Sequence, residues 1–334
     1  MRPPKIKNVK PSIAIEGGKI TIEGTGFDPE EISSLKIAFD GIESRPLLIS
    51  KNRIVTVVPE QTTRGPLTVT LNDKKSNAFE IAIGQKIADN IQAVDSPAFD
   101  SHGNLYTTFS GKRGETVPVS VFKIDSQGSM TPFLSNIPNA TSLAFDSKGN
   151  LYISSRFEGT VYKATPKADV SVFAKELGVP TGLAFDAEGY LYVGDRGGRI
   201  FRISPDGDAK TFAELSESMI AFHLVFDREG NLLVSNPGVS SQNSIMLVDR
   251  YGKAMPLYGG FGRPQGLTVD AAGNVYVCEA KAGESIVLKI NSAGEMTPFL
   301  SGPVMVGIAV DKKGKFAVAT PDAIYLVPPV PSSL

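Results

Sequence analysis

TGLAFDAEGYLYVGDR, at residues 181–196, is one copy of a pattern that recurs through most of the chain. Three other clear copies are TSLAFDSKGNLYISSR (141–156), FHLVFDREGNLLVSNP (222–237) and QGLTVDAAGNVYVCEA (265–280), and weaker copies begin at 95 and 306. The aspartates of the six copies, Asp100, Asp146, Asp186, Asp227, Asp270 and Asp311, lie 46, 40, 41, 43 and 41 residues apart. A period of about 41 residues repeated six times indicates a repeat architecture.

Each repeat is predicted to form four short strands. In the copy at 181–196 and its continuation they are TGLAFD, YLYVGD, GRIFRIS and AKTFAEL, which alternate apolar and polar residues and are rich in β-branched and aromatic ones. Six such units predict an all-β fold, a six-bladed β-propeller. The hexapeptide MTPFLS begins at 130 and again at 296, four periods later, so both copies are expected to form the outer strand of a blade.

An Asp-x-x-Gly sequence separates the first two strands in all six repeats. The Asp side chain can close an Asx turn, and Gly accepts the positive φ of a tight hairpin. Six aspartates on six separate blades cannot converge on one metal ion. The sequence therefore predicts turns at these positions.

The sixth repeat ends after its third strand, AIYLVP at 323–328. The stretch IGQKIADNIQAV (83–94) precedes the first repeat and aligns with an outer strand and its following link. We expect strand 83–88 to pair beside 323–328 and close the ring, because closure removes the open edges of the last blade.

Residues 1–84 do not share the period. They contain about seven short strands punctuated by Pro and Gly, which is typical of a small β-sandwich. Pro11, the Gly17-Gly18 turn, ITIEGTGF (20–27) and the Val58-Pro59 ending resemble the IPT/TIG immunoglobulin-like family. The predicted organisation is an Ig-like sandwich at 1–84 and a propeller at 85–334, and the resemblance implies a spacer or binding module for the first domain.

Composition and charge exclude several classes. The chain has 41% hydrophobic and 21% charged residues and a net charge of −1, so nothing favours nucleic acid or a membrane as partner. Without a signal peptide or a membrane span the protein is expected to be cytoplasmic, or secreted if the true start lies upstream. The single cysteine, Cys278, excludes an internal disulfide and is predicted to be a buried strand thiol.

The repeat geometry predicts where a site lies. Residues that begin the innermost strand and residues that end the second strand share one face of the ring. The candidates at strand starts are Asp95, His223 and Gln265, and those at strand ends are Arg156, Asp195, Arg196, Asn236 and Glu279. We expect Asp95, Asp195, His223, Gln265 and Glu279 to border one concavity that Arg156 and Arg196 rim, and to bind a small polar molecule there.

The PxGLAFDxxGNLYV pattern over 85–334 resembles the NHL and SMP-30/gluconolactonase-like propellers. That resemblance implies a hydrolase of a sugar lactone or similar ester with a divalent cation (Ca²⁺, Zn²⁺ or Mn²⁺). The positions that match the family's metal ligands are Asp95, Phe222 and Gln265, and Phe cannot ligate. The implied assignments are Asp95, Gln265 and Glu279 as metal ligands, Asp95 and His223 as catalytic residues, and Arg156, Asp195, Arg196, Asn236, Gln265 and Glu279 as substrate-binding residues.

Two alternatives stay open at this point. The lost ligand position favours a non-catalytic propeller that binds a small molecule or a protein partner, with the Ig-like domain as spacer. His223 replaces a Gly or Ser of the other repeats, and it is either a structural hydrogen-bonding group or a proton-transfer group at the channel mouth.

Overall fold

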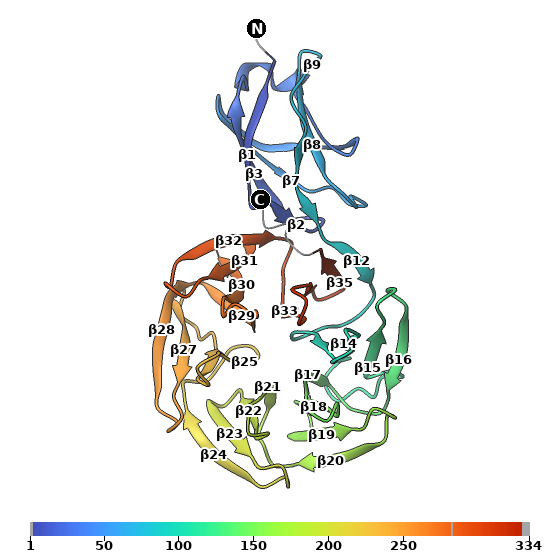
Figure 1. Ribbon diagram of the computed structural model, residues 1–334, viewed down its shortest axis with the longest axis vertical. Coiled ribbons are helices and arrows are strands. Elements are labelled where there is room, and N and C mark those ends of the chain that lie inside the picture. Colours follow the sequence, from blue (N-terminus) through green and yellow to red (C-terminus); the bar gives the residue numbers. More distant parts are fainter. Residues whose placement is uncertain (1–2, 282, 329–334) are drawn as a thin grey trace.

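The computed structural model describes residues 3–281 and 283–328 and contains a β-sandwich beside a ring of blades (Figure 1). One sheet of the sandwich has the order β1-β3-β7-β6, and the other has the order β10-β8-β4-β5 with β9 beside β8. The bounds are β1 Lys5–Lys10, β3 Lys19–Thr25, β4 Lys36–Phe39, β5 Ile42–Ser44, β6 Pro46–Ile49, β7 Arg53–Val57, β8 Pro66–Leu71, β9 Lys74–Lys75 and β10 Phe79–Glu80, with a 3-10 helix, η1, at Pro29–Ser34.

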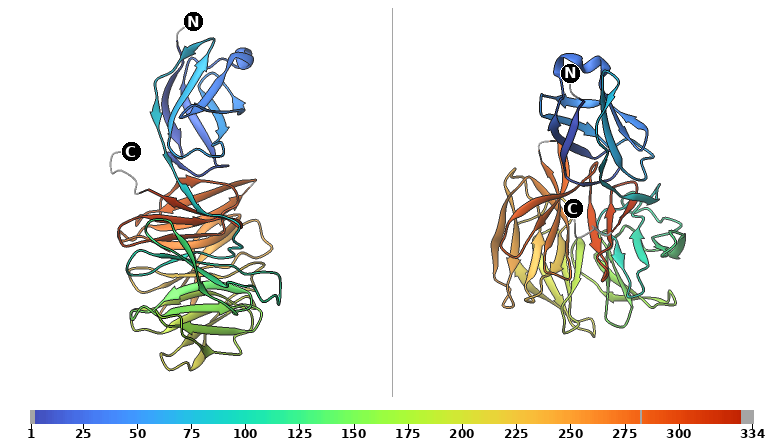
Figure 2. Two further views of the ribbon diagram at one scale, coloured as in Figure 1. Left: turned by 90° about the vertical axis from the view of Figure 1, so that its right-hand side faces the viewer. Right: turned by 45° about the horizontal axis from the view of Figure 1, so that its top comes forward.

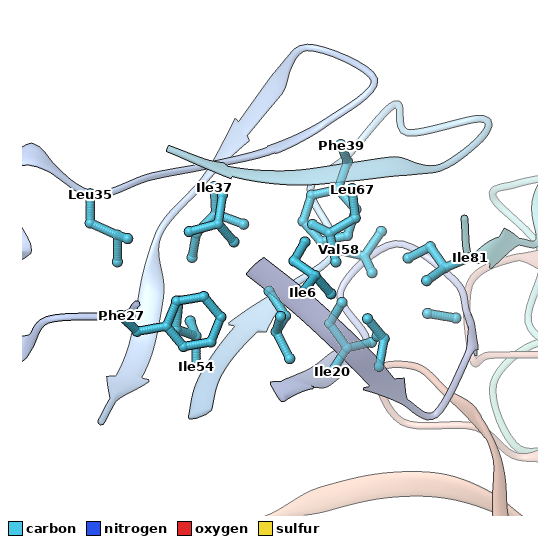
Figure 3. Close-up of a cluster of buried hydrophobic side chains, with 14 of the residues drawn as sticks. Ile6, Ile20, Phe27, Leu35, Ile37, Phe39, Ile54, Val58, Leu67 and Ile81 are labelled. Atoms are coloured by element: carbon cyan, nitrogen blue, oxygen red, sulfur yellow. The ribbon is translucent and has the colours of Figure 1, made fainter. Parts of the chain in front are cut away.

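The core of the sandwich follows from alternation along its strands. In β3 and β8 every second side chain is buried, because successive residues of a strand point to opposite faces. The inward set from the two sheets, which includes Ile20, Ile37, Phe39, Ile54 and Leu67, packs into one apolar cluster (Figure 3).

The ring contains six blades of four antiparallel strands, in sequence order from blade 1 to blade 6. Blades 1 to 3 are β13 Ala98–Phe99, β14 Leu105–Thr108, β15 Val121–Ile124, β16 Met130–Leu134; β17 Ala140–Phe145, β18 Leu151–Ser155, β19 Thr160–Ala164, β20 Val170–Ala174; and β21 Pro180–Phe185, β22 Leu191–Asp195, β23 Arg199–Ile203, β24 Ala209–Glu214. Blades 4 to 6 are β25 His223–Phe226, β26 Leu232–Ser235, β27 Asn243–Val248, β28 Ala254–Phe261; β29 Arg263–Val269, β30 Val275–Lys281, β31 Glu284–Ile290, β32 Met296–Ser301; and β33 Gly307–Val310, β34 Phe316–Ala319, β35 Ile324–Val327, β12 Gln85–Ala88. The predicted fold class is confirmed.

Ring closure is as the sequence predicts. β12 pairs antiparallel with β35, with Gln85 opposite Leu326 and Ala88 opposite Ile324, so an N-terminal strand completes the last blade. The two MTPFLS copies lie in β16 and β32, the outer strands of blades 1 and 5.

The Asp-x-x-Gly turns are also confirmed. In blade 2, Asp146 Oδ1 accepts hydrogen bonds from the backbone N–H groups of Lys148 and Asn150, and Gly149 has a φ of +82°. The other five aspartates accept the corresponding bond from the residue four positions later. These carboxylates are therefore used in folding each hairpin.

Repeated aromatic residues join one blade to the next. Tyr152 contacts Phe173 of its own blade and Phe185 of the next blade edge-to-face, with ring centroids 4.8 and 4.9 Å apart. Tyr106 and Tyr192 make the corresponding pairs. The Tyr of the second strand and the Phe of the Phe-Asp sequence thus recur because together they fill the space between blades.

The sandwich is joined to the ring by more than a linker. β2 (Ile13–Ala14) pairs in parallel with β32 through Ala14 and Ser301, and β11 (Ala82–Ile83) pairs in parallel with β2. Blade 5 thereby extends into a six-stranded sheet, β11-β2-β32-β31-β30-β29. Ile13 and Ile15 are buried in an apolar cluster with residues of blades 5 and 6. The sandwich projects outward from the rim of the ring and leaves both ring faces uncovered (Figure 2).

Within the described ranges, no helix has the length and apolar character needed to cross a membrane.

We expect Ile15→Ala to lower the free energy of unfolding by about 2–5 kcal/mol, because the substitution leaves a cavity in a well-packed cluster. Ile15 is fully buried among Leu300, Met305 and Val327. The matched control is Ile32→Ala, whose side chain is 51% exposed and should change stability by roughly 0.5 kcal/mol at most. Urea unfolding followed by circular dichroism measures both variants. Equal stability of the two would contradict a stabilising role for the domain contact.

Candidate functional site

The innermost strands begin on one face of the ring, here called the His223 face. Four residues before the turn Asp, the six repeats place Ser96, Ser142, Gly182, His223, Gly266 and Gly307. Five of these residues are small because strands converge there: a Cβ on Gly266 would lie 2.5 Å from Gly307 Cα, and one on Gly307 would collide with the backbone of Ser96. His223 is the one large side chain that this ring of positions admits.

His223 reaches Asp95, as the sequence predicts for two residues of one face. Its Nδ1 forms a short hydrogen bond with Asp95 Oδ1, although the two residues are 128 positions apart and lie on blades 4 and 1. Figure 1 places the strands of these blades, β25 and β14, on opposite sides of the channel. His223 is 2% exposed and Asp95 is 5% exposed, so the pair lies inside the ring.

The pair fixes the orientation of the imidazole. The hydrogen bond to Asp95 uses Nδ1 of the ring and so sets the direction in which Nε2 points. Asp95 Oδ1 also accepts from the backbone N–H of Ser96 at 2.6 Å. His223 Nε2 is buried and has no hydrogen-bond partner among the described residues. It is therefore the one imidazole atom left to bind or to move a proton.

Cys278 lies in the same region. Ser154 and Ser235, at the equivalent strand position, each donate a hydrogen bond to a carbonyl of the next blade. Cys278 is fully buried, and burial together with the charge of Asp95 raises the pKa of its thiol. The predicted buried strand thiol is confirmed, and its protonated state makes it a poor nucleophile.

Asp195 and Glu279 do not join this pair, contrary to the predicted shared concavity. Asp195 accepts from the backbone N–H groups of Val179 and Gly197 and forms an ion pair with Arg199 at 2.9 Å. Glu279 accepts from the backbone N–H of Gly262, in the link that precedes its own blade. Both carboxylates are turned into their own blades.

The residue at the end of the second strand has the same structural role in several blades, and this role explains why Asp195 and Glu279 do not face the channel. Ser155 occupies the same repeat position and donates to the carbonyl of Pro138, again in the link before the blade. Thr320 at this position accepts from the N–H of Ala323 in the following turn. The polar residue that ends the second strand therefore fastens the blade, and its recurrence as Ser and Thr was the available signal.

Burial shifts the pKa of Glu279. Its side chain is buried, and this burial raises the pKa of the carboxyl in spite of the bonds from Gly262 and Arg263. Glu279 Oε2 has no hydrogen-bond partner among the described residues.

The remaining predicted residues lie along the same face. Arg196 donates to the carbonyl of Met219 at 3.0 Å, and Asn236 donates to that of Ser216 at 3.1 Å, so both hold the link that enters blade 4. Burial lowers the pKa of Arg156 and the charge of Arg196 lowers it further, which indicates two neighbouring guanidinium groups. Gln265 is half-buried, and its backbone carbonyl accepts from Ser235.

A hollow of about 910 Å³ lies between blades 3 and 4 at the rim of this face. Of the predicted residues, Asn236 lines it, beside hydroxyl, amide and carboxylate side chains of the link at 214–219 and the loop at 238–244. Sequence reasoning missed this hollow. The polar run SNPGVSSQNS (235–244), where every blade except blade 1 has a shorter turn, was the signal that could have shown it.

The described residues do not fit the metal that the family resemblance implies. Phe222, at one ligand position, is fully buried. It packs so closely against blade 3 that a Cβ added to Gly194 would lie 2.7 Å from the Cβ of Phe222. Asp95 is engaged by His223. In residues 3–281 and 283–328, no group of three or more His, Cys, Asp or Glu side chains is arranged to hold a metal ion.

Fold and site together define a two-domain protein, an Ig-like sandwich fused to a six-bladed propeller with a buried His–Asp pair at its axis. Residues 4–83 match the family model for the IPT/TIG domain, and residues 180–203, in blade 3, match the strictosidine synthase-like, N-terminal model. The chain thus combines a domain that matches the IPT/TIG model with a six-bladed propeller.

Solved structures share this fold at low identity. A protein of unknown function from Bacteroides thetaiotaomicron is 16% identical with a TM-score of 0.61, and the match covers 98% of each chain. An auxiliary nutrient binding protein from the same organism is 14% identical with a TM-score of 0.57 over 97% of each chain. A gluconolactonase from Xanthomonas campestris is 16% identical with a TM-score of 0.61, over 73% of this chain and 89% of that one. No curated protein is significantly similar in sequence.

The buried pair predicts strong coupling between its members. His223→Ala leaves Asp95 buried without its partner, and Asp95→Ala does the same to His223, so each is expected to cost about 3–5 kcal/mol of unfolding free energy. The double variant should cost less than the sum by about 0.5–3 kcal/mol. Denaturant unfolding of the four proteins measures the coupling, with exposed His102→Ala as control. Additive losses would show that the pair contributes no interaction energy.

Glu279 predicts a pH dependence of defined sign. A carboxyl whose pKa is raised in the folded state binds more protons there, so stability falls as the pH rises through and above its ordinary value of 4.5. Glu279→Gln keeps an acceptor for Gly262 but cannot ionise. The variant should therefore gain stability relative to wild type between pH 4 and pH 7, as measured by urea unfolding. A constant difference across this range would contradict the raised pKa.

Proposed function

We propose that this protein is a binding protein for a small neutral carbohydrate, which it holds in the hollow between blades 3 and 4. The hollow itself is the observation that carries the proposal. Its volume of about 910 Å³ is within the range of small-molecule sites, and its walls combine Ser216, Gln242 and Ser244 with Met219 and Val239.

The chemistry of these walls suits a polyhydroxylated ring. Hydroxyl and amide groups exchange hydrogen bonds with sugar hydroxyls, and Val239, which is 90% exposed, offers apolar surface to the C–H face of a sugar. Glu214 and Glu217 line the hollow and disfavour an anionic ligand there. Arg196 donates a hydrogen bond to the carbonyl of Met219 and so helps to fix the position of this lining residue.

Asn243 and Ser218 support preorganisation. Asn243 donates to the carbonyls of Ser240 and Gly262 and accepts from the N–H of Gly238, and Ser218 donates to the carbonyl of Pro237. The loop is therefore held in place before any ligand arrives, which lowers the entropy cost of binding. That a fold relative is described as an auxiliary nutrient binding protein is consistent with this role.

The His223–Asp95 pair favours one second candidate, hydrolysis of a sugar lactone or similar ester with the imidazole as general base. Asp95 orients the ring and leaves Nε2 available, which is the arrangement a proton-transfer histidine needs. With both residues almost fully buried, a substrate must first open the channel mouth, and this requirement makes hydrolysis the weaker proposal.

Calorimetric titration distinguishes carbohydrate binding from lactone hydrolysis. The protein is first treated with a chelator and then titrated with glucose, maltose and D-gluconate, each with and without Ca²⁺, Zn²⁺ or Mn²⁺. We expect a neutral sugar to bind without metal, and the Ser216→Ala, Gln242→Ala double variant to weaken binding at least fivefold through the loss of hydrogen bonds worth about 1 kcal/mol each. Gln127→Ala, in an exposed turn of blade 1, is the control.

Two results would overturn the carbohydrate proposal. One is the failure of every sugar to bind, and the other is binding that the double variant leaves unchanged. Turnover of glucono-1,5-lactone above the spontaneous rate, abolished by His223→Ala, would instead establish the lactone hydrolase.

A further inference from the structure

A second cavity, of about 470 Å³, lies where the sandwich meets blade 5, and is here called the interdomain pocket. Its lining includes Lys19 of the sandwich and Arg263, Glu284, Ser301, Pro303 and Val304 of the ring. It is separate from the hollow between blades 3 and 4, so the inference does not rest on the proposed function.

Both domains build this pocket. Lys19, at the start of β3, donates a hydrogen bond to the carbonyl of Gly283 at 3.3 Å. A Cβ on Gly17 would lie 3.5 Å from Pro303, so the sandwich turn rests directly against the wall of the ring. The shared sheet through Ala14 and Ser301 fixes the two sides of the pocket relative to each other.

The charge around the pocket is predominantly positive. Lys19, Arg263 and Lys281 face a single lining carboxylate, Glu284, and none of these four side chains forms an ion pair within the described part of the chain. Lys281 donates to the carbonyl of Gly260, and its charge acts on the buried Glu279. Lys19 also donates to a carbonyl, that of Gly283, but no carboxylate is paired with Lys19 or Arg263 among the described residues, so these two are the cations whose charge is left for a ligand.

One buried polar group at the pocket is unsatisfied. Ser301 lines the cavity and is 2% exposed, yet its Oγ has no hydrogen-bond partner among the described residues. A buried hydroxyl without a partner is costly, and a bound acceptor would remove that cost. Beside it, Ile286, Pro303 and Val304 form apolar walls.

We propose that the interdomain pocket binds a small organic anion, a carboxylate with an apolar body. Lys19 and Arg263 attract the carboxylate from the two domains, the Ser301 hydroxyl supplies a hydrogen bond, and the apolar body lies against Pro303 and Val304. A ligand held in this way contacts both domains, so its binding stabilises their junction by mass action.

The probe is 8-anilinonaphthalene-1-sulfonate, an apolar fluorophore with one negative charge, titrated against the full chain. We expect one saturable site that octanoate displaces and octanol does not. The Lys19→Gln, Arg263→Gln double variant should weaken binding at least tenfold, because it removes both cations while leaving the apolar walls intact. The control with equal charge change, Arg45→Gln, Lys51→Gln, alters exposed residues of the sandwich away from the pocket and should bind as wild type does.

Val304→Glu places a negative charge on the wall and is expected to abolish binding, and unchanged melting temperatures show that each variant is folded. Equal affinity of the Lys19, Arg263 double variant and wild type overturns the proposal, as does displacement by octanol as effective as that by octanoate. Sugar binding between blades 3 and 4 should not change in any of these variants, so failure here and failure of the carbohydrate proposal are distinguishable.

Discussion

The pairing of β12 with β35 is the constraint on which the rest of the structure depends. It closes the ring, and a closed ring forces six innermost strands toward one axis. There the strands approach so closely that Ser96, Gly266 and Gly307 have room only for small side chains or none. The same convergence lets one long side chain from blade 4 contact blade 1. The His223–Asp95 pair is therefore a consequence of closure, since no neighbouring strands bring these residues together.

Closure also explains how the sandwich is attached. β11 and β12 are consecutive, separated by Gly84, so the segment that completes blade 6 is continuous with the strand that pairs with β2. A Cβ on Gly84 would lie 2.7 Å from Ile15, which shows how tightly the chain passes the domain junction. The N-terminal segment thus adds two short strands to the sheet of blade 5 and two isoleucines to the apolar cluster of blades 5 and 6, so its description as a spacer understates the contact.

Sequence reasoning reached the features that repeat. The period, the Asp turns, the closing strand and the placement of Asp95 and His223 on one face all follow from a register that six copies define. The domain junction had no such pattern: β2 and β11 are two residues each, and Ala14 pairs with a strand 287 positions away. Asp195 and Glu279 were misplaced for a different reason. Strand register gives the position of a residue along the ring, but the bonds to Val179 and Gly262 that turn these carboxylates into the blades depend on the links between blades.

The candidate sites of this protein lie where the sequence departs from the repeat. Positions that recur, such as the turn aspartates and the tyrosines between blades, are already bonded or packed and are not free to recognise a ligand. Blade 4 departs in three ways, with Leu233 in place of the Tyr, a loop after β26 that is longer than in every blade except blade 1, and His223 in place of a small residue. It borders both the axial pair and the hollow. Blade 5 departs at its outer strand, because β2 pairs with β32 there. Next to this pairing, Ser301 and Arg263 line the same pocket as Lys19. Because the repeat gives every blade the same scaffold, the departures in blades 4 and 5 are where this ring presents side chains that the repeat itself does not use.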